Sequence, residues 1–222
     1  MRYVVAALLL LSSAPVAQAR PVVVELFTSQ ACSSCPPADA LLARLAKSMD
    51  ILPLSFSVTY WNSPAWTDSD SLQGATDRQN WYASLAGSQD VYTPEAVVDG
   101  TAQMVGSDAE KVTAAIAVAK ASLAGDVPVS VKGGATISIS IGAGSGNANV
   151  LLFGYDSQHS TRTGGGENDG ATITEVNVVR SITSLGPWTG QQMSMSMSRP
   201  AGDHIAVLLQ ASNGAILGVG VK

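Results

Sequence analysis

The sequence predicts an α/β domain that is followed by an antiparallel β-sandwich. Strand-like and helix-like segments alternate through residues 20–125, a pattern typical of a sheet covered by helices. From residue 126 onward the chain instead contains short alternating apolar segments separated by turn residues. Glycine follows the same division, since only four of the 21 glycines precede residue 125. We therefore expect a boundary between residues 125 and 126.

The N-terminus has the features of a secretory signal peptide. Arg2 precedes an apolar run at residues 4–11, and Ala17-Gln18-Ala19 has the small residues of a cleavage site. The apolar run is much shorter than the roughly 20 residues that cross a bilayer. We expect residues 1–19 to be removed, leaving a periplasmic or secreted protein with no membrane anchor.

The chain is acidic. It has 12 Lys and Arg against 17 Asp and Glu, a net charge of -5, and loss of Arg2 with the signal peptide makes this -6. An acidic chain without a basic stripe is not expected to bind nucleic acid or an anionic membrane surface.

The first part has the order β, α, β, α, β, β, α. Its predicted strands and helices are residues 22–27, 37–49, 51–58, 72–86, two short strands within 95–105, and 108–124. Asp99-Gly100 favours a type I′ turn between the two short strands. Ser107 and Glu110 match a capping box, and Gly125 matches a C-terminal cap, so the last helix is expected between them.

The second part contains seven candidate strands. They are residues 127–131, 136–141, 149–155, 173–180, 192–197, 204–210 and 216–221. Seven short strands with turn residues between them are typical of an antiparallel β-sandwich.

Cys32 and Cys35 are the only cysteines of the chain, in the segment "TSQACSSCPP". Three roles are open. A metal site would need ligands beyond the pair, and the two histidines of the chain lack zinc-finger spacing. A structural disulfide suits an exported protein, although closing so short a loop contributes only about 2 kcal/mol. A redox pair is favoured by placement, because C-x-x-C lies between a strand and a helix.

The redox interpretation depends on the Cys32 thiolate. Backbone N–H groups and the dipole at the helix start favour a thiolate, and Cys35 is placed to attack a mixed disulfide formed with a substrate. Pro36 and Pro37 lack N–H groups, so we expect the cysteines just before the helix and a moderate lowering of the Cys32 pKa. This interpretation also requires an accessible Cys32 sulfur.

Thr93-Pro94 and a group of aromatic residues are candidates for substrate binding. A proline at the start of the strand permits a cis bond, which would leave the Thr93 backbone free to pair with an extended peptide; an ordinary trans turn is the alternative. Trp61 and Trp66 belong to an aromatic-rich stretch, residues 60–92, that suits a peptide-binding surface or a core.

The segments "VELFTSQACSSCPPADALLARL", "VTYWNSPAW", "VYTPEAVVDG" and "GENDGATITEVNVVRSITSLGPW" resemble a bacterial family of secreted proteins of unknown function with a thioredoxin-like domain. This resemblance implies a thioredoxin-like fold for residues 20–125. It also implies Cys32 as attacking thiol, Cys35 as resolving thiol and Pro94 as a facing cis-proline. Glu25 falls one position from the buried acid of thioredoxins, so it is a candidate for proton transfer or, alternatively, a solvent-exposed carboxylate.

The leading hypothesis is a thiol-disulfide oxidoreductase that acts on protein or peptide thiols and disulfides, with an unidentified redox partner and without a cofactor or metal. The first alternative is a non-enzymatic binding module that uses the aromatic stretch or the β-sandwich for contacts. The second is a copper-handling protein, because Met193, Met195 and Met197 share one face of a predicted strand and thioethers bind Cu(I). Apolar packing is the more ordinary role for these methionines.

Overall fold

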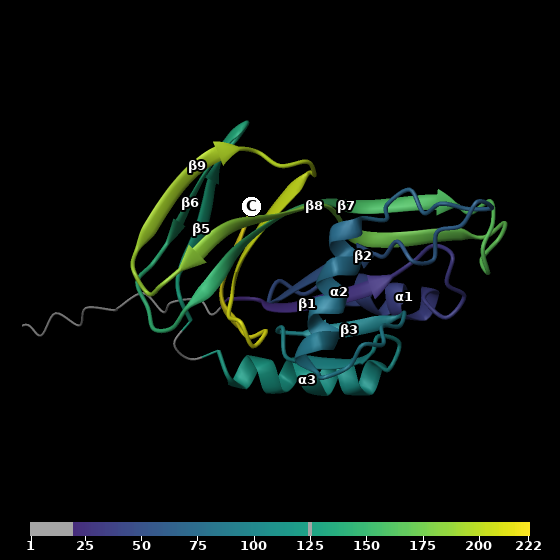
Figure 1. The fold of residues 1–222 in the computed structure, drawn as a ribbon, viewed down its shortest axis with the longest axis horizontal. Coiled ribbons are helices and arrows are strands. Elements are labelled where there is room, and N and C mark those ends of the chain that lie inside the picture. The colour runs from purple at the N-terminus through teal and green to yellow at the C-terminus, as the bar shows by residue number, and fades with distance from the viewer. Residues whose placement is uncertain (1–19, 124–125) are drawn as a thin grey trace, which may run out of the picture.

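A computed structural model describes residues 20–123 and 126–222 (Figure 1). The predicted signal peptide, residues 1–19, and the predicted cap at Gly125 lie outside these residues. Within the described ranges, no helix has both the length and the apolar character needed to cross a bilayer.

Three helices and eleven strands make up the described fold. In chain order they are β1 (Val22–Thr28), α1 (Pro36–Leu45), β2 (Ile51–Ser57), α2 (Gln73–Leu85), β3 (Glu95–Val98), β4 (Ala102–Val105), α3 (Ala109–Ala121), β5 (Val129–Gly133), β6 (Thr136–Ile141), β7 (Ala148–Arg162), β8 (Thr172–Trp188), β9 (Met193–Ser198), β10 (His204–Gln210) and β11 (Ile216–Val221). The predicted order of elements in both parts is therefore confirmed.

One eight-stranded mixed sheet joins the two parts of the chain (Figure 1). Its strand order is β11-β10-β7-β8-β2-β1-β3-β4. β1 pairs in parallel with β2, and β2 meets β8 through a parallel bridge between Ser55 and Val178. Strands from both sides of residue 125 thus share one sheet, while the division into two domains at residues 125 and 126 stays a prediction.

The two faces of this sheet are covered differently. Alternate residues of β1 point to opposite faces. Val23 and Phe27 pack into a core with Tyr82 of α2, whereas Val24 and Leu26 pack with α1 and α3. The helices therefore lie on both sides of β1, with α2 alone on one side.

A second, antiparallel sheet of three strands has the order β5-β6-β9. Its inward residues form a core with Trp188 and with alternate residues of β7 and β10. Met193, Met195 and Met197 are partly buried against this core, so their thioethers serve there as apolar packing.

β7 and β8 form a hairpin much longer than predicted. The sequence placed strands only at residues 149–155 and 173–180, but the pairing continues to Arg162 and Thr172. Residues 156–162 are largely polar and partly exposed, so they carry no apolar signal, yet the ladder holds them in strand conformation. The extension carries the hairpin past α1, against which β8 packs (Figure 1).

Two local predictions had different outcomes. Asp99 and Gly100 both have positive φ angles, 50° and 76°, as the predicted type I′ turn requires. The predicted capping box of Ser107 and Glu110 is wrong. Asp108 is the N-cap instead, because its side chain accepts a hydrogen bond from the Lys111 N–H and its carboxylate suits the positive end of α3.

Candidate functional site

The cysteine pair lies between β1 and α1. Cys32 and Cys35 form a disulfide with a Cα–Cα distance of 5.5 Å. Cys35 is the N-cap of α1, and its carbonyl accepts hydrogen bonds from the N–H groups of Ala38 and Asp39. Pro36 and Pro37 occupy the first helical positions, where a missing N–H costs nothing. Cys32 is therefore outside the helix, as the prolines predicted.

The expected accessibility of the Cys32 sulfur is not met in this oxidised structure. Cys32 and Cys35 each have 0 % relative exposure, while Ser33 and Ser34 between them are exposed. Cys32 Sγ lies 3.3 Å from Ser34 Oγ and 3.9 Å from the Thr93 carbonyl oxygen. A thiolate from outside can reach this sulfur only if the surrounding loop moves.

Of the predicted substrate-binding residues, Thr93 and Trp61 lie at the disulfide and Trp66 packs elsewhere. The Thr93-Pro94 bond is cis, and the Thr93 carbonyl faces Cys32. The indole N–H of Trp61 donates to Thr93 Oγ1 at 2.7 Å, which ties the aromatic stretch to the same place. Trp66 lies against Gly164 and Gly165 instead, and within residues 20–123 and 126–222 its buried indole nitrogen has no hydrogen-bond partner.

A second loop, which the sequence did not predict at this site, binds the cysteine loop. We call residues 163–171, between β7 and β8, the hairpin loop. Asn168 Nδ2 donates to the carbonyls of Gln30 and Cys32 at 3.0 and 2.8 Å. Glu167 Oε2 accepts from the N–H and hydroxyl of Ser33, and its own N–H donates to the Ala31 carbonyl. The hairpin loop thus makes five hydrogen bonds to the cysteine loop, four of them to backbone groups around Cys32.

The signal for this contact was the run of glycines in "TGGGENDG". Gly166 has φ +75°, and a Cβ placed on it would lie 2.7 Å from the Ala31 Cβ. A glycine is needed there for both reasons, because no other residue combines that backbone angle with so close an approach. A glycine in a loop does not indicate which residue packs against it, so the contact with Ala31 could not be deduced from the sequence.

We expect Gly166→Ala to weaken the contact between the two loops. Gly170→Ala is a matched control, because Gly170 also has φ +75° but no atom within 4 Å of its Cβ position. Both variants carry a similar backbone cost of roughly 1 kcal/mol. Urea denaturation should show a further loss of about 1 kcal/mol or more in Gly166→Ala alone. Equal losses in the two variants would mean that the Ala31 contact contributes no stability.

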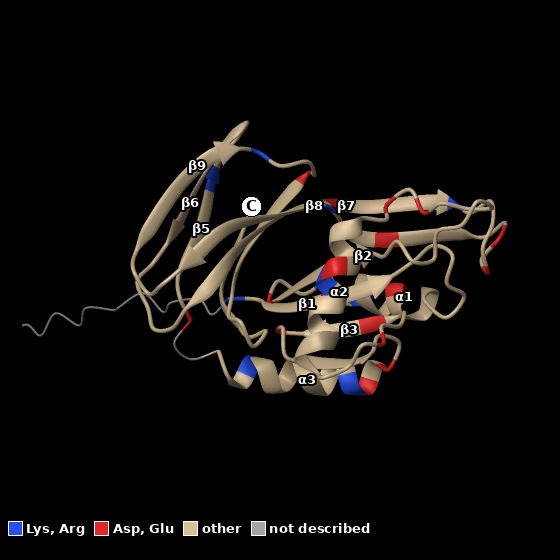
Figure 2. Cartoon of the chain, viewed as in Figure 1, with Lys and Arg blue, Asp and Glu red and all other residues tan. Residues whose placement is uncertain are grey.

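Several acidic side chains are buried behind the cysteine loop, at an end of the molecule rich in acidic residues (Figure 2). Gln30 connects them, since its N–H donates to Asp68 and its Nε2 to Asp70 and Glu175. Burial raises the pKa of Asp68 above its usual range. Burial also raises the pKa of Glu175 to about 8, with further increases from Asp39 and Asp68.

Asp39 is the acid of this group on the helix that Cys35 caps. Thr28 Oγ1 donates to Asp39 Oδ1 at 2.9 Å, while Oδ2 is buried and has no hydrogen-bond partner among the residues that the structure describes. Burial raises the pKa of Asp39 to about 7, although the Thr28 hydrogen bond opposes this. Asp39 follows Cys35 by four positions and has a pKa near neutral pH, which makes its carboxyl a candidate proton donor or acceptor for this cysteine.

Glu25, the acid singled out by resemblance, has different contacts. It is fully buried on the α2 side of β1, where it forms an ion pair with Arg78 and accepts a hydrogen bond from Tyr82 at 2.6 Å. Its predicted alternative, a solvent-exposed carboxylate, is therefore wrong. A role in proton transfer stays a prediction for Glu25, whose charge Arg78 balances.

Comparison with known proteins assigns the chain to a family. Residues 23–210 match the family described as protein of unknown function (DUF1223), and the chain belongs to this family. The X-ray crystal structure of protein AGR_C_4864 from Agrobacterium tumefaciens is similar, with a TM-score of 0.80 and 33% identity over 93% of this chain and 95% of that one. HBP35 of Porphyromonas gingivalis has a similar fold, with a TM-score of 0.63 and 12% identity over 93% of this chain and 76% of that one. No curated protein matches the chain.

Proposed function

We propose that this protein is a thiol-disulfide oxidoreductase with a thioredoxin-like fold, which acts on protein or peptide substrates in the periplasm or outside the cell. The observation that carries the proposal is the disulfide at the N-cap of α1 with the Thr93 carbonyl, before cis-Pro94, facing Cys32. An extended substrate could pair with the Thr93 backbone and present a sulfur to Cys32. The hydrogen bond from the Trp61 indole to Thr93 Oγ1 would keep Thr93 in place beside Cys32.

In the direction that oxidises a substrate, two thiolates of the substrate act in turn. The first attacks Cys32 Sγ, so a substrate–Cys32 bond forms, the Cys32–Cys35 bond breaks and Cys35 leaves as a thiolate. The second attacks the substrate sulfur of this mixed disulfide, and Cys32 leaves as a thiolate. The substrate departs as a disulfide, and the pair has gained two electrons. A second dithiol–disulfide protein would restore the oxidised pair, and the reverse sequence reduces a substrate.

Asp39 is the better supported proton donor for the Cys35 thiolate. It lies in the first turn of α1, and burial raises its pKa to about 7. Its Oδ2 has no hydrogen-bond partner among the described residues. Protonated Asp39 can deliver a proton when Cys35 leaves, and its carboxylate can accept one in the reverse direction. Burial and the nearby Asp39 charge raise the pKa of Glu175 to about 8, so this group contains a second buried carboxyl that can hold a proton.

Trapping tests the proposal directly. Cys35→Ala leaves Cys32 as a free thiol without a resolving partner. When Cys32 attacks a peptide that contains a disulfide, one peptide sulfur leaves as a thiolate and a mixed disulfide with Cys32 should accumulate. The adduct should appear on a non-reducing gel and disappear with dithiothreitol. Cys32→Ala is the matched control. The Thr93 carbonyl lies against Cys32, so the remaining Cys35 should capture at least tenfold less peptide. Equal capture by both variants, or capture by neither, would contradict the proposal.

The burial of both cysteines favours a second candidate, a non-enzymatic binding module with a structural disulfide. The redox potential separates the two candidates. Equilibration with glutathione should give a potential above about -300 mV for a working pair, and a lower value for an inert structural bridge.

A further inference from the structure

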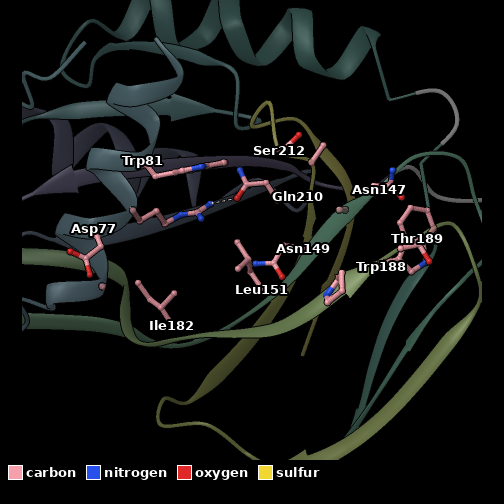
Figure 3. Close-up of a pocket in the computed structure, with 15 residues that line it drawn as sticks. Asp77, Trp81, Asn147, Asn149, Leu151, Ile182, Trp188, Thr189, Gln210 and Ser212 are labelled. Carbon is pink, nitrogen blue, oxygen red and sulfur yellow. Dashed lines mark hydrogen bonds between the residues drawn. The ribbon is translucent and has the colours of Figure 1, made fainter. Parts of the chain in front are cut away.

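A cavity of about 770 Å³ lies between α2 and the curved part of the large sheet (Figure 3). Fifteen residues line it, from α2, the start of β7, the second half of β8, the end of β10 and the residues that flank these strands. None of them belongs to the loops that surround Cys32 and Cys35. Its volume is in the range of sites that hold small organic molecules.

One wall of the cavity is apolar. Trp81, Leu151 and Ile182 provide it, and each of them is only partly buried. On their other side these side chains pack against the core that α2 covers, which holds them in place without a ligand. The surface that they leave open to the cavity favours the apolar body of a ligand.

The charge of Arg78, which also lines the cavity, is not available to a ligand. Its guanidinium forms an ion pair with Glu25, with Nη2 2.7 Å from Oε1. It also donates to the Tyr82 hydroxyl and to Gln210 Oε1, the latter bond drawn in Figure 3. The Arg78 Cζ lies 6.0 Å from the centre of the Trp81 ring, so the cation–π position at this indole is already occupied.

Asp77, the other charged residue of the lining, is turned away from the cavity (Figure 3). Its Oδ1 accepts a hydrogen bond from Gln73 Nε2 at 2.9 Å, and the residue is exposed to solvent. Among the described residues that line the cavity, none therefore presents an unpaired charge to its interior. An ionised group that entered would lose water without gaining a partner, which costs free energy.

Polar but uncharged side chains complete the lining. They are Asn147, Asn149, Thr189 and Ser212, and all four are exposed. Asn147 and Thr189 lie on the opposite side of the cavity from Asp77 (Figure 3). Hydroxyl and amide groups can exchange hydrogen bonds with an alcohol or an amide, but they cannot neutralise a charge. The polar part of the lining therefore also favours a ligand without charge.

We propose that this cavity binds an uncharged, mainly apolar small molecule, whose rings or chain lie against Trp81, Leu151 and Ile182. Molecules of the same shape that carry a charge of either sign bind more weakly, because the charge must stay in water or be buried without a partner. The site is separate from the disulfide, so the proposal does not depend on the proposed redox function.

Three probes with the same naphthalene body test the proposal. They are 1-naphthylmethanol, 1-naphthylmethylamine and 1-naphthoate, which are neutral, cationic and anionic at neutral pH. Each is titrated into the purified, isotope-labelled protein at about 0.15 M salt, which screens long-range attraction to the acidic chain, and amide chemical shifts are followed by NMR. The alcohol should bind with a Kd on the order of 1 mM or below, and about fivefold or more tightly than either ion. The largest shifts should occur at Trp81, Leu151 and Ile182.

Two variants locate the binding. Asn149 is exposed and lies on the same face of β7 as Leu151, so Asn149→Trp places a large ring in the cavity. It should weaken binding of the alcohol about tenfold or more, because the ring occupies the space that buries the ligand. Thr174→Trp is the matched control, since Thr174 is an exposed position of β8 outside the cavity, and it should leave the affinity unchanged.

Three results would each overturn the proposal. They are an ion that binds as tightly as the alcohol, no saturable binding of the alcohol, and unchanged binding to a folded Asn149→Trp protein. The comparison of the three probes and the location of the shifts use the unaltered protein, so they decide the question even if Asn149→Trp fails to fold.

Discussion

Replacing Asn168 with alanine is expected to speed reduction of the Cys32–Cys35 disulfide by dithiothreitol about fivefold or more. Asn168 donates to two carbonyls, those of Gln30 and Cys32, on the loop that buries the sulfur. Each such bond is worth about 0.5–1.5 kcal/mol, so the loss of both raises the population of an opened loop roughly 5- to 150-fold. If attack on Cys32 requires that opening, the rate rises by the same factor.

The rate is measured by quenching timed samples with a maleimide that shifts the protein on a gel. Asn80→Ala is the control, because Asn80 is an exposed asparagine of α2 and its loss should leave the rate unchanged. Urea denaturation must show that Asn168→Ala remains folded under the conditions of the assay. An unchanged rate in a folded Asn168→Ala protein would mean that the sulfur is reached by another movement, such as one on the Thr93 side.

The sequence allowed the order of elements to be predicted, because each segment carried its own hydrophobic period. The apolar run of β1 and the stripe of Leu41 and Leu42 on α1 are local signals of this kind. The union of both parts in one sheet was not predictable, because the parallel bridge between Ser55 and Val178 joins residues more than a hundred positions apart. Nothing in either segment specifies that partner.

Some residues of the candidate site could likewise be predicted from the sequence, and others could not. Cys32, Cys35 and Pro94 were found from spacing, turn chemistry and resemblance. Asn168 was missed because its role depends on the length of the β7–β8 hairpin, and the outer part of that hairpin is stabilised by pairing between strands rather than by an apolar pattern. The sequence places Asp39 in the first turn of α1, but its burial could not be deduced from that helix position.

Asp39→Asn is expected to make the protein more stable at pH 8 and to remove much of the loss of stability that the wild-type protein undergoes as pH rises from about 4 through 7. The pKa of Asp39 is raised from 3.8 to about 7 by burial, so between these pH values the unfolded chain releases a proton that the folded chain keeps. The stabilising contribution is therefore complete below about pH 4 and is lost as pH rises through 7. Glu175 adds a similar loss up to about pH 8.

Asparagine keeps the oxygen that accepts from Thr28 and replaces the second oxygen with a neutral group of the same size. Urea denaturation at pH 5 and pH 8 should show a drop in the free energy of unfolding for the wild-type protein. The drop should be smaller in Asp39→Asn, by an amount on the order of a few kcal/mol at most. The exposed Asp90→Asn control should retain the whole drop. If Asp39→Asn retained it as well, Asp39 would not hold a proton at neutral pH, and the Cys35 thiolate would have to take its proton from Glu175 or from water.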